Sequence, residues 1–204
     1  MAIIDDLAFM PDSRPYGLSF QTWTEKWWLW LLGIPKSLNP ALDATGKCCA
    51  RDQTDRNVWF LAGTLGGAAK RECTIPAGKA ILFPIILDEQ SFAERPDFKS
   101  ESELETLAKV QIDSVKEISA AIDGIQLLDL KKHRVQTRPF DVILPDDNIC
   151  GIKAGPTRAA ADGYWFFLKP MTAGKHTIHA MGRGSHFYTE VTHDLTMVNS
   201  NIVC

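Results

Sequence analysis

The sequence predicts a mainly β fold, an antiparallel β-sandwich of jelly-roll or immunoglobulin-like type with two packing α-helices. Three observations predict it. After Gly124 the chain consists of short apolar segments separated by turn signals, which is typical of sandwiches and barrels. The last of these segments alternates apolar and polar residues, as a half-buried strand does. Two other segments, residues 19–32 and 101–122, carry helical signals.

The two predicted helices have clear boundaries. Ser19 begins the first helix, and Gly33 and Pro35 end it. Its aromatic stripe consists of Phe20, Trp23, Trp27, Trp30 and Leu31. Ser100 and Glu103 form a capping-box pattern at the start of the second helix, whose apolar spacing continues to Ile122. We expect both helices to cover faces of the sheets, and a ligand platform made of indoles is the alternative for the first helix.

The predicted strands lie between and after the helices. They are Val58–Ala62, Ala80–Leu87, Gln126–Asp129, Arg134–Phe140, Asp141–Leu144, Tyr164–Leu168, Lys175–Met181 and Phe187–Val198. The strand at 80–87 is apolar throughout, which indicates burial of both faces. Pro84 within it suggests a sheet edge or a bulge. We expect a single domain over residues 1–204, with an irregular lead-in at 1–18.

Composition excludes several classes of partner. The formal net charge is −3, so no basic surface for nucleic acid is predicted. The longest apolar candidate, Trp27–Ile34, is far shorter than the roughly 20 residues of a membrane span. The N-terminus has no basic segment of a secretory signal, which favours a cytoplasmic location. A small-molecule ligand remains the expected partner, and a homo-oligomer is left open.

The cysteines carry no recognisable metal motif. They number five, at positions 48, 49, 73, 150 and 204. An odd count without a signal favours reduced thiols, although a bridge among Cys48, Cys49 and Cys73 stays open for an oxidising compartment. No Cys-x2-Cys pair or closely spaced histidine accompanies them. We therefore predict no metal ligands and no cofactor.

The candidate catalytic residues are two acids and two histidines. Asp88 and Glu89 directly follow the buried strand at 80–87, where a scaffold can hold polar groups in place. His176 and His179 fall in the next-to-last strand, and histidine suits acid–base work near neutral pH. The candidate substrate-binding residues are Trp23, Trp27, Arg134, Tyr164 and Gln53.

Strand alternation separates these histidines. His176 and His179 point to opposite faces, so a strand without a bulge cannot direct both at one ion. We expect His179 to face Glu190 across the final turn, and His193 to lie in the core with one hydrogen-bond partner. Purely structural roles are the alternative for all three histidines.

Several segments resemble a family of bacterial proteins without an assigned activity, many of them secreted. The segments are WTEKWWLWLLGIP, NPALDATGKC, VWFLAGTLGG, CTIPAGKAILFPII and DGYWFFLKPMTAGKHTIHAMG. The resemblance spans nearly the whole chain and implies no reaction or ligand. Secreted members are presumed to carry a disulfide, which the missing signal does not favour here.

Two functions follow as hypotheses. The first is a small-molecule enzyme of the lyase, isomerase or hydrolase type. Its aromatic-lined pocket would lie between the sandwich and the Trp-rich helix, with Asp88 or Glu89 and one histidine transferring protons. The second is a non-catalytic module of the same fold that binds a ligand or a protein.

Overall fold

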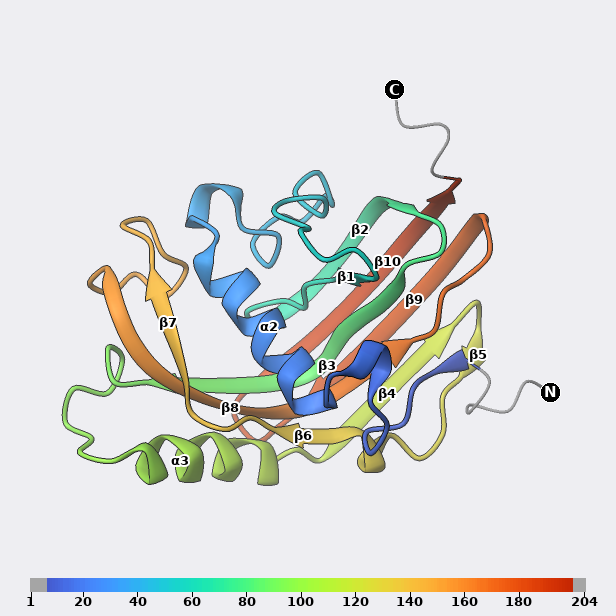
Figure 1. Ribbon diagram of the computed structural model, residues 1–204. Helices are drawn as coiled ribbons and strands as arrows, with labels where there is room; N and C mark the ends of the chain where they lie inside the picture. Colours follow the sequence, from blue (N-terminus) through green and yellow to red (C-terminus); the bar gives the residue numbers. More distant parts are fainter. Residues whose placement is uncertain (1–6, 200–204) are drawn as a thin grey trace.

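The computed structural model describes residues 7–199, which form two mixed β-sheets and two α-helices (Figure 1). Sheet A contains β1 (Val58–Phe60), β3 (Ala80–Ser91), β8 (Gly155–Leu168) and β6 (Arg134–Gln136) in that order, and β7 (Phe140–Leu144) also pairs with β8. Sheet B contains β2 (Gly67–Pro76), β10 (Tyr188–Val198), β9 (Gly174–Arg183), β4 (Glu117–Ile122) and β5 (Ile125–Gln126) in that order.

Sheet A is the middle layer of the molecule. Helix α2 (Phe20–Gly33) packs on one face through a buried cluster that includes Trp23, Trp27, Trp165 and Phe167. A second buried cluster joins the other face of sheet A to sheet B. Helix α3 (Glu101–Asp113) packs against β3 and β8 and lies below them in Figure 1.

The aromatic stripe of α2 explains how this helix is held. The helix begins at the Ser19 cap, whose Oγ accepts a hydrogen bond from the Thr22 amide at 3.1 Å. Trp23 and Trp27 are almost fully buried, and each ring contacts other aromatic rings edge to face. Their Nε1 atoms donate to the carbonyls of Pro15 and Leu61, at 2.8 and 2.9 Å. The stripe therefore covers a sheet, as predicted.

The predicted second helix is too long. Helix α3 ends at Asp113, and residues 117–122 form strand β4. Leu104, Ala108 and Ile112 keep helical spacing and are buried. Beyond Ser114, Ile118, Ala120 and Ile122 instead pack into the cluster between the sheets from alternate positions of a strand that pairs with β9. The apolar residues of α3 and β4 together keep a helix-like spacing in the sequence, although the chain changes from helix to strand after Asp113.

The strand pairing is mixed. β1 pairs with β3 in parallel, and β2 pairs with β10 in parallel. The prediction of antiparallel pairing alone is therefore wrong for these two pairs, while the jelly-roll or immunoglobulin-like type stays a prediction. Strand β2 was not predicted, although Arg71, Cys73 and Ile75 are buried in alternation along it.

Several strand boundaries also differ from those predicted. Asp88 to Ser91 lie within β3, where they pair with β8, so the strand continues beyond the predicted end at Leu87. Of the predicted strand at 126–129, only Gln126 is in a strand, and of 134–140 only 134–136 and Phe140 are. β8 begins at Gly155, nine residues before the predicted Tyr164.

The termini and short helices complete the description. From Leu7 the lead-in contains a bridge from Ala8 to Leu168 and a 3₁₀ turn at Pro15–Gly17, and residues 1–6 lie outside the described part. Further 3₁₀ turns occupy Lys36–Leu38 and Leu130–His133. Among residues 7–199, no helix combines the length and apolar character needed to cross a bilayer.

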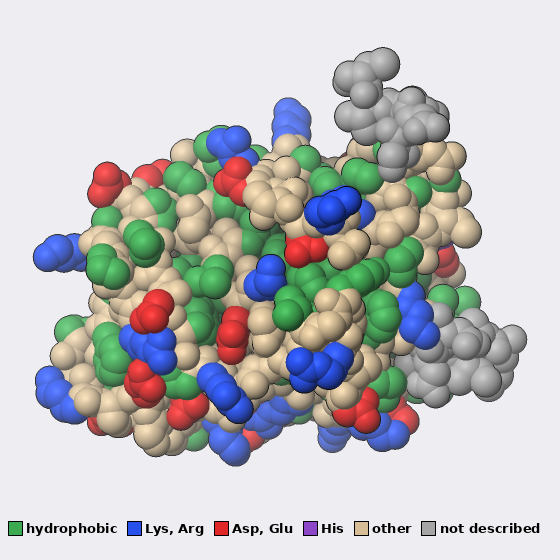
Figure 2. Space-filling model, in the orientation of Figure 1, with side chains coloured by type: hydrophobic (Ala, Val, Ile, Leu, Met, Phe, Trp, Pro, Cys, Tyr) green, Lys and Arg blue, Asp and Glu red, His purple; other side chains and the backbone are tan. Residues whose placement is uncertain are grey.

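Charged side chains of both signs follow the lower border of the face in Figure 2, and hydrophobic side chains lie among polar ones toward its middle. This face carries no continuous basic patch. The distribution agrees with the near-neutral composition of the chain.

Candidate functional site

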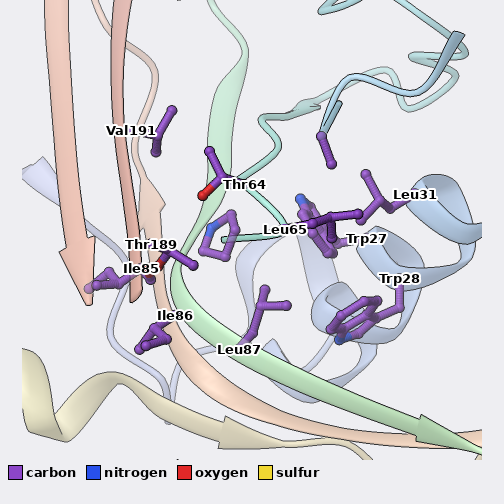
Figure 3. A pocket seen from close by; sticks show the side chains of 13 residues that line it. Trp27, Trp28, Leu31, Thr64, Leu65, Ile85, Ile86, Leu87, Thr189 and Val191 are labelled. Atoms are coloured by element: carbon purple, nitrogen blue, oxygen red, sulfur yellow. Dashed lines mark hydrogen bonds between the residues drawn. The ribbon is translucent and has the colours of Figure 1, made fainter. Parts of the chain in front are cut away.

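A pocket lies between α2, the β1–β2 loop, β3 and β10 (Figure 3). It holds about 420 Å³ of empty space, the open solvent at its mouth included. In Figure 3 the α2 residues lie on one side, Thr189 and Val191 on the other, and β3 runs between them. Its walls come from Trp27, Trp28, Leu31, Ala41, Gly63, Thr64, Leu65, Pro84, Ile85, Ile86, Leu87, Thr189 and Val191.

A bulge in β3 forms the floor of this pocket. The β3–β8 register shifts between Pro84 and Ile86, and both residues line the pocket. Proline has no amide hydrogen to give to a ladder, so a bulge is where a sheet accommodates it. The bulge that Pro84 suggested in the sequence is confirmed.

The polar groups of the pocket wall are mostly occupied. Thr64 and Thr189 donate their hydroxyls to the carbonyls of Gly67 and Ile85, at 3.2 and 3.1 Å. Trp28 differs, because its side chain is only 5% exposed and its buried Nε1 has no hydrogen-bond partner among the described residues. The Nε1 atoms of Trp59 and Trp165 also have none, but neither residue lines the pocket. Trp28 is thus the lining residue whose buried donor has no partner.

Arg71 of β2 holds the loops that carry two of the lining residues. Its guanidinium is 2% exposed and donates to four carbonyls, those of Ala41, Asp43, Ala62 and Gly63, at 2.6 to 3.0 Å. Asp43 lies nearby, and hydrogen bonds from the Cys48 and Thr45 amides and the Thr45 hydroxyl outweigh burial and lower the pKa of Asp43 to about 2.

Of the predicted binding residues, Trp27 lines the pocket. The Trp23 side chain lies between α2 and sheet A, and its Nε1 donates to the Pro15 carbonyl. Gln53 supports its own loop, because its side chain donates to the Cys49 and Phe60 carbonyls and accepts from the Phe60 amide.

Arg134 and Tyr164 lie on the face of sheet A that meets α3 and sheet B. Arg134 pairs with Asp162, from Nη2 to Oδ2 at 2.7 Å, and with Asp113 of α3, from Nη1 to Oδ1 at 2.7 Å. Tyr164 is half-buried and packs against the cluster between the sheets. Both side chains therefore point away from the face that α2 covers.

Asp88 and Glu89 are neighbours on β3 and point to opposite faces of sheet A. Asp88 pairs in register with Asp162 on the α3 face and accepts a hydrogen bond from Gln90 at 2.7 Å. Burial raises the pKa of Asp88 to about 6. Glu89 points to the α2 face, and burial together with Glu94 raises its pKa well above the usual range.

The histidines do not join these acids. His176 contacts Asp123 through Nδ1 at 2.8 Å and the Thr172 carbonyl through Nε2 at 3.1 Å. His179 contacts Glu190 through Nε2 at 2.9 Å, so the predicted pairing of these two residues is confirmed. Both histidines belong to β9 of sheet B, whereas Glu89 lies on the far face of sheet A.

His193 is a core residue. It is 1% exposed, and its Nε2 contacts the Ala62 carbonyl at 3.2 Å. Its buried Nδ1 has no partner among the described residues, so the prediction of a core histidine with one hydrogen bond is confirmed. Burial and the charge of Arg71 lower the pKa of His193 to about 3.

Three residues that the sequence did not indicate could take part in binding or chemistry. Trp28 lies off the helix stripe yet lines the pocket, while Glu94 and Cys150 lie close to Glu89. Burial and Glu94 raise the pKa of Cys150 to about 12. The sequence signal for Cys150 was Asn148 in the same loop, because an asparagine side chain can close a turn by hydrogen bonds to the backbone.

The cysteines within residues 7–199 are free thiols. Cys49 and Cys73 are buried in the cluster between the sheets, and the contact between their thiols lowers the pKa of Cys49 and raises that of Cys73. Cys48 is half-buried, and Cys204 lies outside the described residues.

No family model, no curated protein and no solved structure matches this chain. The site must therefore be interpreted from its own geometry.

Proposed function

We propose that this protein is a non-catalytic binding module that takes a small, mostly apolar molecule into the pocket between α2 and β3. The observation that carries the proposal is the largely apolar, aromatic wall of this pocket, in which Trp28 has an unpaired Nε1. Ligand pockets combine apolar walls with a few polar groups. A ligand with one hydrogen-bond acceptor would satisfy the indole and fill the apolar space.

The separation of the acids from the histidines supports binding over catalysis. Proton transfer by two groups needs both within hydrogen-bond reach of one substrate. Glu89 lies on sheet A, and His176 and His179 are bonded to Asp123 and Glu190 on sheet B. An acid–base enzyme is the second candidate, favoured by the raised pKa of Asp88 and Glu89.

A fluorescence titration with 1-anilinonaphthalene-8-sulfonate tests the proposal, because this probe joins an apolar ring system to an acceptor group. We expect saturable binding of one probe molecule per chain. Leu65 lines the pocket and is 57% exposed, so Leu65→Asp places a charge at the mouth with little effect on the core. We expect it to weaken binding by about tenfold, or about 1.4 kcal/mol.

Leu128→Asp is the matched control, since Leu128 is 64% exposed and lies outside this pocket. Trp28→Phe keeps an aromatic ring and removes the donor, and we expect it to weaken binding about fivefold. Circular dichroism checks that each variant folds. Equal losses for the two aspartate variants, or binding that never saturates, would show that the probe occupies some other surface.

A further inference from the structure

Three potential metal ligands meet near the end of β3, on the face that α2 covers. Glu89 comes from the strand, Glu94 from the turn after it, and Cys150 from the loop between β7 and β8. One ligand atom of each, a carboxylate oxygen or the thiol sulfur, lies within 4.8 Å of the other two. All three residues are half-buried. The fold thus brings together groups that lie up to 61 positions apart in the sequence.

Each of the three is held by hydrogen bonds of its own segment. Glu89 lies in the β3–β8 ladder opposite Ala161. Glu94 accepts a hydrogen bond from the Ser91 hydroxyl at 2.7 Å, and its amide donates to the Ser91 carbonyl at 3.1 Å. Asn148 closes the loop around Cys150 by donating to Pro145 and Ile152, at 3.0 and 2.7 Å. Such support from neighbouring groups is what a preformed ligand set requires.

The charge of this cluster has no internal counterpart. Within residues 7–199, no ion pair joins Glu89 or Glu94 to a basic side chain. The buried Oε1 of Glu89 also has no hydrogen-bond partner among these residues. Burying a carboxylate without a partner is costly, so a bound cation would stabilise this cluster.

We propose that Glu89, Glu94 and Cys150 form a binding site for one Zn²⁺ ion. A thiolate with two carboxylates suits a borderline-soft divalent ion, whereas Mg²⁺ and Ca²⁺ prefer oxygen alone. Zinc lies about 2.3 Å from sulfur and about 2.1 Å from oxygen, which sets neighbouring ligand atoms about 3.6 Å apart. Rotation of the two carboxylates supplies the small approach that this requires. Three protein ligands leave a fourth position for water.

Binding would release protons. Zinc binds a cysteine as the thiolate and a glutamate as the carboxylate, so protons compete with the ion for the same atoms. A zinc ion replaces these protons with bonds to oxygen and sulfur, and the protons pass to the solvent. We therefore expect the affinity for zinc to rise as the pH rises from 6 to 8.

The test uses the full chain, freed of metal by a chelator and then titrated with Zn²⁺ in a calorimeter and with Co²⁺ in a spectrophotometer. We expect one ion per chain and, with Co²⁺, the near-ultraviolet charge-transfer band of a thiolate ligand. Cys150→Ser should abolish the band. Glu89→Gln and Glu94→Gln should keep the thiol and weaken Zn²⁺ binding by about tenfold or more.

Two variants are matched controls. Cys48→Ser removes a half-buried thiol outside the cluster, and His179→Gln removes a surface histidine paired with a carboxylate, so neither should change the band or the affinity. A band that persists in Cys150→Ser, or that disappears in Cys48→Ser, would overturn the proposal. So would the absence of saturable zinc binding by the unmodified chain. Because these readouts do not involve the anilinonaphthalene probe, they stand apart from the proposed ligand pocket.

Discussion

Gly182 on β9 marks a point where the two sheets approach closely. A Cβ at this position would lie 2.4 Å from the Cβ and 2.8 Å from the Cγ2 of Ile86. Ile86 is 1% exposed and has little freedom to move. We expect Gly182→Ala to lower the free energy of unfolding by about 1–3 kcal/mol through overpacking, measured by urea unfolding followed by circular dichroism.

Gly33 provides the control for that measurement. It ends α2, and nothing lies within 4 Å of a Cβ built there. Gly33→Ala should therefore leave stability within about 0.5 kcal/mol of the parent. If Gly182→Ala unfolds at the same urea concentration as Gly33→Ala, the backbone at Gly182 does not pack closely against Ile86.

At the level of single elements, Arg71 links β2 to the loops beside the pocket. Arg71→Met would remove a hydrogen-bond donor from four buried or half-buried carbonyls. We expect a loss of about 3 kcal/mol in the free energy of unfolding and weaker binding of the anilinonaphthalene probe, because Ala41 and Gly63 line the pocket. Urea unfolding and the fluorescence titration measure the two effects.

Lys70→Met is the control for Arg71→Met. Lys70 precedes Arg71 on the same strand but is exposed, with an ion pair to Asp194 at 3.0 Å. Exposed pairs contribute little to stability, so the control should unfold close to the parent. An Arg71→Met variant as stable as the control would show that the guanidinium does not hold these loops.

Local patterns predicted elements well where one face of an element is buried. The stripe of α2 and the alternation of β10 are such cases, and both elements lie within two residues of their predicted bounds. β2 went unpredicted because its inward residues begin with Arg71, and a buried arginine disguises the alternation of a strand. The polar residues from Asp88 to Ser91 likewise placed the predicted end of the strand at Leu87, although pairing with β8 extends it to Ser91.

At the scale of the whole molecule, contacts between distant segments determine the features that local sequence patterns could not predict. The parallel pairs β1–β3 and β2–β10 have no local turn to signal them. Glu89 was a predicted site residue, but its neighbour Cys150 reaches it only because β7 and β8 return the chain to the end of β3. His176, His179 and His193 lie close together in the sequence, but strand pairing gave each of them a different partner.

The stability of the whole molecule should depend on His193 in acid. Its pKa is about 3 in the folded protein, against about 6.5 when unfolded. Between these values the unfolded chain binds more protons, so the free energy of unfolding falls as the pH falls below 6.5. The loss attributable to His193 between pH 7 and pH 5 is about 2 kcal/mol.

Asp88 acts in the opposite direction. Its pKa is about 6 when folded and 3.8 in its ordinary range, so between these values the folded state binds more protons and gains stability as the pH falls. A pH series on the parent alone would therefore mix the two effects.

His193→Gln isolates the histidine, because Asp88 is common to both proteins, and His186→Gln supplies an exposed histidine as the control. Urea unfolding at pH 7, 6 and 5 should show the parent and His186→Gln losing about 2 kcal/mol relative to His193→Gln. Parallel profiles for all three proteins would mean that His193 is already charged, or is not enclosed, in the folded state.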